Sequence, residues 1–405
     1  MSQTLQTDVV IIGAGTAGSY AMREVRKAKR NYLLVDHGPL GTVCARVGCM
    51  PSKVALHAGA QWQAATTVDA IGGHGASNLT LDRDQTWQFL RQQRDGFANP
   101  TASRIRQSAG EHLIMGRAQL LSSTKVLVEL NDGGTVEIDT KAIVIANGST
   151  SIVPKWLDSV RSRVITTDEL FELKQLPESL GILGLGAIGL EMGLAMSRLG
   201  IQVTGADIAS TIGGMQDPEV ANRAIERFSQ EFAIWLQTEP KLSLEEDGIL
   251  MQASDGRQAK VDLLLAALGR RPNVDTLNLE QAGIELDARG IPVFNRHTMQ
   301  VGQLPIFIAG DVNNDVPLMH EAGDEGQIAG FNAARMAADP AQAPLAFQRK
   351  TPIGIAFTDP DLISVGQNFA QLKSDDIVVG QAQAQGNGRS RVFGETAGLL
   401  HIYAN

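Results

Sequence analysis

The stretch that decides the fold is DVVIIGAGTAG at residues 8–18, where a short β-branched run leads directly into Gly13, Gly15 and Gly18. The run predicts a buried strand, and the residues up to about Lys29 are compatible with a helix. LLVD at residues 33–36 predicts the next strand, which ends at Asp36. Strand, glycine-rich loop, helix and strand in this order form a β-α-β unit whose loop and helix N-terminus bind the pyrophosphate of a dinucleotide.

The same order returns in the middle of the chain. LGIL at 180–183 predicts a strand, a helix follows to about Leu199, and QVTGAD at 202–207 predicts a second strand; the loop glycines are Gly184, Gly186 and Gly189. In each copy the acidic residue lies 23 positions after the first glycine, at Asp36 and at Asp207. Identical spacing indicates an internal repeat of two dinucleotide-binding units. Glycine loops that are merely structural are the alternative in each case.

The second unit favours NAD over NADP. Asp207 is placed to accept hydrogen bonds from a free ribose 2′-hydroxyl, whereas a 2′-phosphate requires a nearby cation. Residues 199–222 contain no Lys or Arg.

Length, charge and hydropathy exclude several classes of protein. A chain of 405 residues predicts two or three domains. The net charge of -9, without a clustered basic face, argues against nucleic acid and anionic membrane as partners. The longest apolar stretch, residues 180–197, contains several glycines and Glu191, so strand and helix explain it better than a membrane span. The first residues resemble no leader peptide, and we expect a cytoplasmic protein.

The two cysteines, Cys44 and Cys49, both lie in GTVCARVGCMPSK. Their spacing fits no common zinc site, and no further cysteines exist to complete a set of four ligands. A redox-active disulfide is the better hypothesis, with Lys53 close enough to favour a thiolate. Two reduced cysteines in a helix are the alternative.

The remaining pattern predicts an α/β protein in which one dinucleotide-binding domain is interrupted by another. KVLVELNDGGTVEID predicts a hairpin that ends in the strand KAIVIANGS. VDLLLAALGRRPN (261–273) predicts a strand leaving the second unit, and IFIAGDV (306–312) predicts a strand returning to the first. We expect these segments: 1–150 for the first domain, 151–272 for the second, 273–346 for the return to the first, and 347–405 for a third, strand-rich α+β domain that stops abruptly.

The ordered motifs CARVGCMPSK, GLGAIGLE, ALGRRPN, FIAGDV and TDPDLISVG resemble the pyridine nucleotide-disulfide oxidoreductase family over essentially the whole chain. The resemblance implies FAD in the first Rossmann-like domain, NAD in the second, and a homodimer formed through the third. Among members of the family, the chain is most similar to those that oxidise a protein-bound dihydrolipoyl dithiol. A lipoyl-bearing domain, or a small dithiol or disulfide, is the substrate this implies.

The resemblance also implies roles for individual residues. Cys44 would exchange with the substrate, Cys49 would face the flavin, and Lys53 would pair with Glu191 near the flavin. An unpaired Glu191 that reaches solvent is the alternative for that residue. Further FAD contacts would come from Asp311, which is otherwise a helix cap, and from the family's helix-starting segment at Pro317, Leu318, Met319 and His320. Gly116, Asn147, Gly148 and Ser149 match further FAD contacts, and Gly269 matches a backbone position on the NAD side. Plain turns are the alternative for these five residues. No metal is expected.

The chain departs from the family pattern in four places. Val43 stands where threonine usually precedes the first cysteine, Arg46 where asparagine is common, and Asn147 where threonine is common. None of the seven histidines precedes a proline, so the His-Pro acid-base segment near the family's carboxyl end has no counterpart, and we expect a truncated tail. Another NADH-driven disulfide or metal-ion reductase, or an assembly component with only diaphorase activity, remain alternative functions.

Overall fold

The computed structural model describes residues 3–372, 377–394 and 396–404. The chain forms two compact units, each assembled from three segments. Unit 1 comprises residues 1–46, 95–150 and 270–350, and unit 2 comprises residues 47–94, 151–269 and 351–405. Two helices, α2 (Val43–Val47) and α4 (Arg83–Ala109), and the strand β6 (Ser149–Ser151) contain points where the chain passes from one unit to the other.

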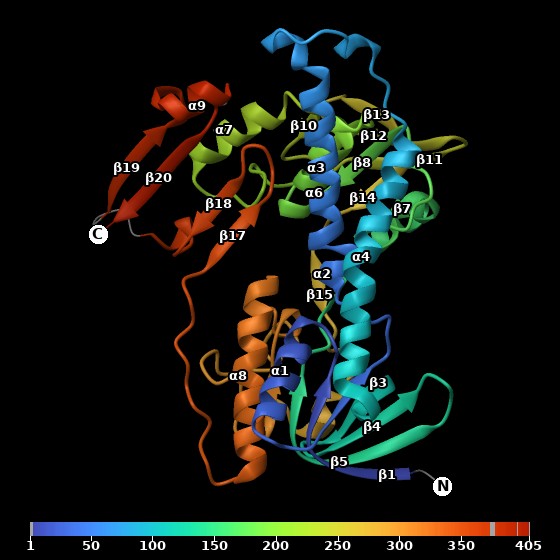
Figure 1. Cartoon of the computed structure of the whole chain (residues 1–405), viewed down its shortest axis with the longest axis vertical. Coiled ribbons are helices and arrows are strands. Elements are labelled where there is room, and N and C mark those ends of the chain that lie inside the picture. Colours follow the sequence, from blue (N-terminus) through green and yellow to red (C-terminus); the bar gives the residue numbers. More distant parts are fainter. Residues whose placement is uncertain (1–2, 373–376, 395, 405) are drawn as a thin grey trace. The chain divides into compact units, whose positions relative to one another are not determined.

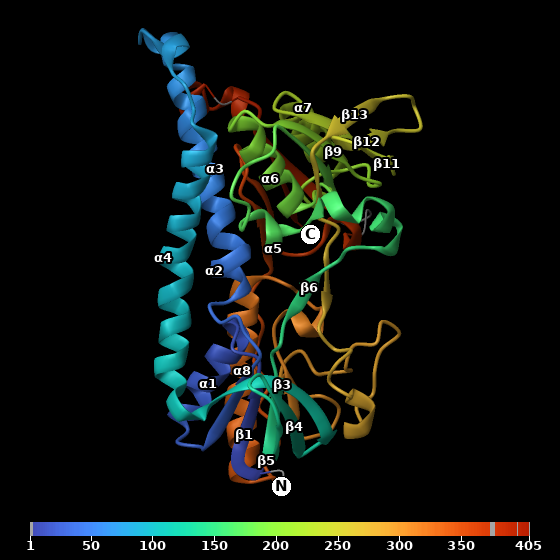
Figure 2. The same ribbon diagram turned by 90° about the vertical axis from the view of Figure 1, so that its right-hand side faces the viewer.

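Unit 1 is built on a mixed sheet. Strand β1 (Gln3–Ile12) pairs in parallel with β2 (Tyr32–Asp36) and with β5 (Thr135–Ile145), and β5 pairs in parallel with β16 (Ile306–Ile308). Two further strands, β3 (Leu113–Ser122) and β4 (Lys125–Leu130), lie between β2 and β5 in the sheet. Strand β3 is parallel to β2, and β4 is antiparallel to both β3 and β5. Figure 2 shows β1, β3, β4 and β5 gathered at one end of this unit.

Two helices cover the sheet of unit 1. Helix α1 (Thr16–Lys27) follows the first glycine loop, and α8 (Met319–Ala338) packs beside it (Figure 1). Close packing is possible because α8 presents glycine to α1: a Cβ on Gly326 would lie 2.2 Å from the carbonyl oxygen of Ala17. Each helix is amphipathic, and its apolar face is buried against the other helix and against the sheet. Short 3-10 turns complete the unit at Gly110–His112, Leu279–Ala282 and Asp311–Asn313.

Unit 2 contains a five-stranded sheet in which every pairing is parallel. Its order is β10 (Ala233–Trp235), β9 (Gln202–Ala206), β8 (Ser179–Leu183), β14 (Leu263–Ala266) and β7 (Val164–Ile165). Most of these strand residues are buried, as expected for a parallel sheet covered on both faces. A separate antiparallel sheet consists of β11 (Lys241–Glu245), β12 (Gly248–Gln252) and β13 (Gln258–Val261).

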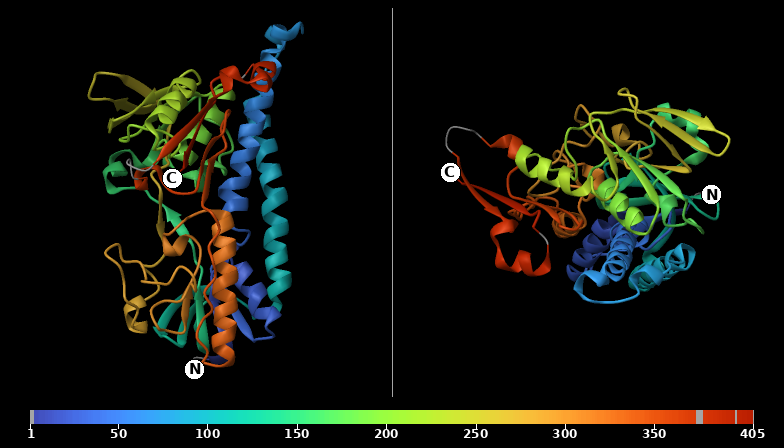
Figure 3. Two further views of the ribbon diagram at one scale, coloured as in Figure 1. Left: turned by 90° about the vertical axis from the view of Figure 1, so that its left-hand side faces the viewer. Right: turned by 90° about the horizontal axis from the view of Figure 1, so that it is seen from above.

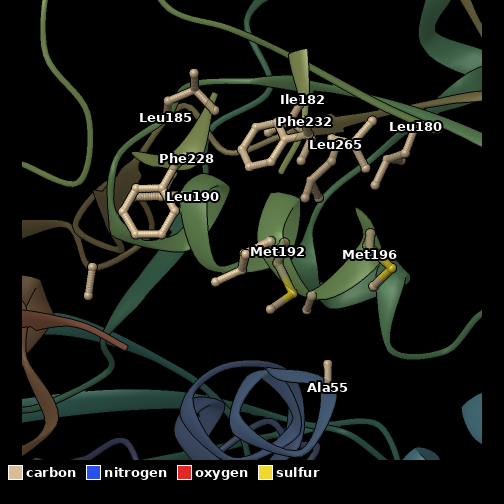
Figure 4. Packing of buried hydrophobic residues seen from close by; sticks show 14 of the residues in the cluster. Ala55, Leu180, Ile182, Leu185, Leu190, Met192, Met196, Phe228, Phe232 and Leu265 are labelled. Atoms are coloured by element: carbon tan, nitrogen blue, oxygen red, sulfur yellow. The ribbon is translucent and has the colours of Figure 1, made fainter. Parts of the chain in front are cut away.

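The core of unit 2 lies around helix α6 (Ala187–Arg198), between the sheet and helix α3 (Cys49–Thr66). Figure 4 shows Ala55 of α3 facing α6, with Phe228 and Phe232 packed on the side of the sheet. The two helices approach closely because α3 carries Gly59, where a Cβ would lie 3.0 Å from the Cβ of Arg198. Other helical elements of the unit are α5 (Thr167–Leu170), α7 (Pro218–Phe228) and the 3-10 turns Val68–Ile71, Ala76–Asn78 and Lys155–Arg163.

The last segment of unit 2 consists of two hairpins. One pairs β17 (Ile353–Ala356) with β18 (Leu362–Val365), and the other pairs β19 (Val378–Gln383) with β20 (Leu399–Ala404). The second hairpin lies beside α7 (Figures 1 and 3), where His401 Nδ1 is 2.5 Å from Asp217 Oδ2. The turns Phe369–Gln371 and Ala384–Gly386 and helix α9 (Gly388–Phe393) connect or flank these strands.

The predicted mixed α/β class is confirmed, and so are the strands and helices of both predicted β-α-β units. The predicted hairpin near 120–140 is confirmed as β4 and β5, and β5 continues beyond the hairpin into the parallel sheet beside β1. One prediction on strands was wrong. The stretch 261–273 divides into β14 and β15 (Arg270–Pro272), since Gly269 between them adopts a φ of +94°.

Candidate functional site

The first glycine loop brings strand β1 and helix α1 into close contact. Gly13 has a φ of +103°, and a Cβ on Gly18 would lie 1.8 Å from the Gly13 carbonyl oxygen, so neither position accepts a side chain without movement. Gly15 is different: it precedes α1 with ordinary extended angles and has no atom within 4 Å of a built Cβ. A side chain at Gly15 would project into open space, where a ligand has access to the loop and the helix N-terminus.

The second loop repeats this arrangement almost atom for atom. Gly184 has a φ of +89°, a Cβ on Gly189 would lie 1.9 Å from the Gly184 carbonyl oxygen, and Gly186 again has nothing within 4 Å. The repeat seen in the sequence is therefore also a repeat in geometry. Each loop has one position left open at the start of a helix, which is the feature of a phosphate-binding turn.

Both acidic residues bind the glycine loop of their own unit. The Asp36 carboxylate accepts hydrogen bonds from the Ala14 N–H at 2.7 Å and the Gly38 N–H at 2.6 Å. Asp207 likewise accepts from the Leu185 N–H at 2.6 Å and the Ala209 N–H at 2.8 Å. A carboxylate offers about four lone-pair sites, so each retains acceptor capacity for a ribose hydroxyl.

A cavity of about 250 Å³ opens beside the first loop, within unit 1. Gly13, Asp36, Gly116 and Asn147 lie on its wall, and sequence analysis assigned all four to one ligand. A Cβ on Gly116 would lie 2.4 Å from the Glu129 carbonyl oxygen, which explains glycine inside strand β3. The loop open at Gly15, the acidic Asp36 and this adjoining space together fit the nucleotide half of FAD.

Residues 147–150 form several hydrogen bonds with Asn273, two of which are reciprocal. Asn147 Nδ2 donates to the Asn273 carbonyl oxygen at 2.6 Å, and Asn273 Nδ2 donates back to the Asn147 carbonyl oxygen at 2.9 Å. The Asn273 N–H also donates to the Gly148 carbonyl oxygen, and Thr150 Oγ1 donates to Asn273 Oδ1. This set gives Asn147 a definite structural use, in place of the threonine common in similar sequences.

A second set of hydrogen bonds orients Asp311. Ser149 Oγ donates to Asp311 Oδ2 at 2.8 Å, while Arg270 donates from Nε to Ser149 Oγ at 2.8 Å and from Nη2 to the Ser149 carbonyl oxygen at 2.7 Å. Because the guanidinium occupies an acceptor site of the hydroxyl, the single proton of Ser149 is directed to Asp311. Asp311 begins a 3-10 turn after β16, and the N-cap position of this turn is held by Gly310 and not by Asp311.

The other predicted cofactor residues lie at the ends of elements. Leu318 precedes helix α8, which begins at Met319, so residues 317–320 are a helix start as expected. Met319 is 51% exposed, and this stretch is not part of the cavity wall. Gly269 lies in unit 2, where its carbonyl oxygen accepts the Ile152 N–H at 3.0 Å.

Cys44 and Cys49, the two cysteines of the chain, are both disulfide-bonded. Cys44 lies in the short helix α2, and Cys49 is the first residue of α3. The alternative of two reduced cysteines is therefore wrong. Lys53 follows Cys49 by four residues, so it lies on the same face of α3 one turn later.

Lys53 forms an ion pair with Glu191 of helix α6, within unit 2. Lys53 Nζ lies 3.0 Å from Glu191 Oε1 and 2.8 Å from Oε2, and the Glu191 side chain is only 6% exposed. The Phe357 N–H donates to Glu191 Oε1 at 2.9 Å, so the carboxylate is well satisfied. The alternative of an unpaired Glu191 in solvent is excluded. Nearby, burial and the Asp359 carboxylate raise the pKa of Asp361, although Lys53 opposes this.

Several residues at these sites were not predicted from the sequence. The cavity wall also includes His37, Arg117, Thr150, Arg271 and Asn273. Phe357 and Arg270 contact the predicted residues directly. Arg270 and Asn273 lie in the quoted motif ALGRRPN, and Phe357 directly precedes TDPDLISVG, so the motifs themselves were the available signal.

Among the described residues, no group of three or more His, Cys, Asp or Glu side chains is arranged to hold a metal ion. Within the same part of the chain, no helix combines the length and the apolar character needed to cross a membrane.

A model of the family described as "Pyridine nucleotide-disulphide oxidoreductase" matches residues 7–326. The chain is 29% identical to dihydrolipoyl dehydrogenase 3 of Haloarcula marismortui over 419 aligned residues, covering 99% of this chain and 85% of that protein. It is also 29% identical to the mitochondrial dihydrolipoyl dehydrogenase of Homo sapiens, covering 99% of this chain and 79% of that protein.

Solved structures show the same fold. The HOCl-induced flavoprotein disulfide reductase RclA from Escherichia coli, in its Cu(II) complex, superposes with a TM-score of 0.80 at 24% identity, covering all of this chain and 87% of that one. LpdA from Mycobacterium tuberculosis superposes with a TM-score of 0.82 at 21% identity, covering 98% of this chain and 87% of that one.

Proposed function

Because the chain belongs to the pyridine nucleotide-disulphide oxidoreductase family, we propose that it is an FAD- and NAD-dependent dihydrolipoyl dehydrogenase with Cys44 and Cys49 as its redox disulfide. The observation that carries the proposal is the disulfide itself, placed at the start of α3 in a chain with two geometrically equivalent dinucleotide loops. The named relatives support the lipoyl substrate, since they are dihydrolipoyl dehydrogenases at 29% identity over almost the whole chain.

The proposed reaction is a thiol-disulfide exchange followed by removal of two electrons. One sulfur of the dihydrolipoyl dithiol attacks Cys44, which breaks the Cys44–Cys49 bond, forms a mixed disulfide and leaves Cys49 as a thiolate. The second substrate sulfur then attacks the mixed disulfide, so lipoyl disulfide leaves and Cys44 is released as a thiol. FAD, when bound, supplies a two-electron carrier between the cysteine pair and NAD⁺. The disulfide re-forms as NAD⁺ becomes NADH.

In this proposal, the remaining residues bind and orient the cofactors. The loop of Gly13, Gly15 and Gly18 and the N-terminus of α1 bind the FAD pyrophosphate, and Asp36 accepts a ribose hydroxyl. Asp311, held by Ser149, accepts hydroxyls of the ribityl chain.

Further contacts belong to the same proposal. Gly116, Asn147, Gly148 and residues 317–320 complete the FAD site. Lys53 with Glu191 supplies a fixed charge pair to the flavin.

The second loop, with Gly184, Gly186, Gly189 and Asp207, binds NAD, and Gly269 supports it from the backbone. The absence of Lys and Arg from residues 199–222 favours NAD over NADP, because a 2′-phosphate would have no cation in this segment. The third domain, 347–405, is the proposed interface of a homodimer.

Cys49→Ser tests the proposal. It should abolish NAD⁺ reduction by dihydrolipoamide while leaving FAD bound, because serine cannot form the disulfide. The measurement is NADH formation at 340 nm, together with an anaerobic titration of the flavin spectrum. In the unsubstituted protein, two-electron reduction should produce a long-wavelength band from a thiolate beside oxidised flavin, and the variant should lack it. Dihydrolipoamide turnover by Cys49→Ser would remove the disulfide from the mechanism.

The substrate is tested separately. The same enzyme is assayed with NADH against NADPH, and with lipoamide against glutathione disulfide and mercuric ion. Preference for NADH and lipoamide supports the proposal. Brisk reduction of glutathione disulfide or mercuric ion with no lipoamide activity would replace it by a different disulfide or metal-ion reductase of the same family.

A further inference from the structure

Phe357 contacts the Lys53–Glu191 ion pair in two different ways. Its backbone N–H donates to Glu191 Oε1 at 2.9 Å. Its ring lies over the ammonium, with 4.4 Å between Lys53 Nζ and the ring centroid. One residue therefore contacts both the carboxylate and the cation, and all three residues belong to unit 2.

The ring is a further contact of an ammonium that its polar partners leave partly exposed. Lys53 Nζ contacts both carboxylate oxygens of Glu191 and lies 3.4 Å from Ser52 Oγ, yet its side chain remains 35% exposed. A cation over the face of an aromatic ring is stabilised by about 0.5–2 kcal/mol, depending on how far water is excluded. Phe357 thus opposes the movement of Lys53 away from Glu191 into solvent.

The position of Phe357 is itself fixed. It follows strand β17, and two residues later Asp359 accepts a hydrogen bond from Arg198 Nη1 at 2.9 Å. Since Glu191 and Arg198 both belong to helix α6, the segment 357–359 is attached to that helix at two points seven residues apart. The ring nevertheless stays 44% exposed, so burial in the core does not account for an aromatic residue here.

We propose that Phe357 is a positioning residue that holds the Lys53 ammonium against Glu191, through its ring on one partner and its backbone N–H on the other. The consequence for flavin chemistry rests on the function proposed above. The positioning of Lys53 does not, because every contact that carries it lies within the protein chain.

The test compares substitutions that separate the ring face from its bulk. All three variants keep the backbone N–H. Phe357→Leu keeps most of the apolar volume but removes the π face, Phe357→Ala removes the volume as well as the face, and Phe357→Tyr keeps an aromatic face. The readout is the rate at which acetic anhydride acylates Lys53 in the holoenzyme, followed by peptide mass spectrometry. Lys350, an exposed lysine paired with Asp324, serves as the internal reference.

Acylation requires Lys53 to leave its partners, so Phe357→Leu should raise its rate relative to Lys350 by roughly 2- to 30-fold. Phe357→Ala should raise it at least as much, and Phe357→Tyr should return it to the original rate. Equal rates in Phe357→Leu and the unsubstituted protein would overturn the proposal, because bulk alone would then suffice. A rise shared by Lys350 would also overturn it, as it would report general loosening.

A second readout connects the residue to the proposed chemistry. The rate constant for flavin reduction by NADH should change in Phe357→Leu and recover in Phe357→Tyr, while the FAD content stays constant. If Cys49→Ser retained dihydrolipoamide turnover, the proposed function would fail, yet the acylation rates would still decide the role of Phe357.

Discussion

At the scale of single residues, the buried charge of Arg198 is shared by several partners. Arg198, with a side chain 3% exposed, donates to Glu231 and to Asp359. Glu231 accepts from Arg227 as well. Burial by itself opposes ionisation of Glu231, but the hydrogen bonds from Arg198 and Arg227 outweigh it and lower the pKa of this carboxyl.

The lowered pKa of Glu231 predicts an acid-dependent loss of stability. A carboxyl whose pKa is depressed in the folded state stabilises the protein above its unfolded pKa of about 4.3, and this contribution disappears as the pH falls through the folded value. Glu231→Gln should therefore cost about 2 kcal/mol at pH 7 and lose most of that difference in acid. The measurement is urea unfolding between pH 3 and 7.

Glu226→Gln is the matched control, because Glu226 is an exposed glutamate of helix α7, which ends shortly before Glu231. It should change stability by less than about 0.5 kcal/mol at any pH. A Glu231→Gln difference that is constant with pH would contradict the assigned ion pair.

At the scale of elements, the glycines within each loop have different roles, and the two loops share the same division of roles. Gly189 permits contact between α6 and the strand end at Gly184, whereas Gly186 leaves open space in front of the helix. The first loop has the same division between Gly18 and Gly15. Packing and ligand binding therefore depend on different glycines of one motif.

Substitution by alanine should separate these two uses. Gly186→Ala should leave the free energy of unfolding nearly unchanged but weaken NADH binding at least tenfold, since the methyl group occupies the proposed pyrophosphate position. Gly189→Ala should destabilise unit 2 by about 1–3 kcal/mol or more, because its Cβ would overlap the Gly184 carbonyl oxygen. Urea unfolding and NADH fluorescence titration measure the two effects. Full NADH affinity in Gly186→Ala would refute the proposed second site.

At the scale of the whole molecule, each unit is assembled from segments far apart in the chain. The core of unit 2 combines the parallel sheet with Ala55, Trp87 and Leu90 from one segment and Ala356 and Leu362 from another. Trp87 is fully buried, and its ring is stacked 6.0 Å from that of Phe171. The predicted division into 1–150, 151–272, 273–346 and 347–405 follows the motifs, whereas the packed cores follow a different division.

A fragment of residues 151–272 should therefore fold poorly. It lacks the side chains that cover α6 and Phe171, so it should bind a hydrophobic dye and unfold with little cooperativity. Trp87→Ala in the whole chain is the comparison, with an expected cost of about 3–5 kcal/mol from one lost side chain. Cooperative unfolding of the fragment at the temperature of the whole chain would show that 151–272 is independently stable.

Much of the fold was predictable because the deciding signals are local. A β-branched run, a positive-φ glycine and a close helix-strand contact are properties of neighbouring residues, so DVVIIGAGTAG and LGILGLGAIG predicted both β-α-β units and both acidic residues. The cysteine pair is local too, since four residues separate Cys44 from Cys49.

The tertiary structure decided which distant residues meet, apart from Lys53 and Glu191, whose pairing the family resemblance implied. The contacts of Phe357 with that pair, of Arg270 with Ser149, and of Asn273 with Asn147 were not predicted. More than 100 residues separate the partners in each of these contacts. A contact of this kind depends on how the chain returns through several elements and which side chains then fill the space, and no periodicity or turn preference within a short stretch encodes it.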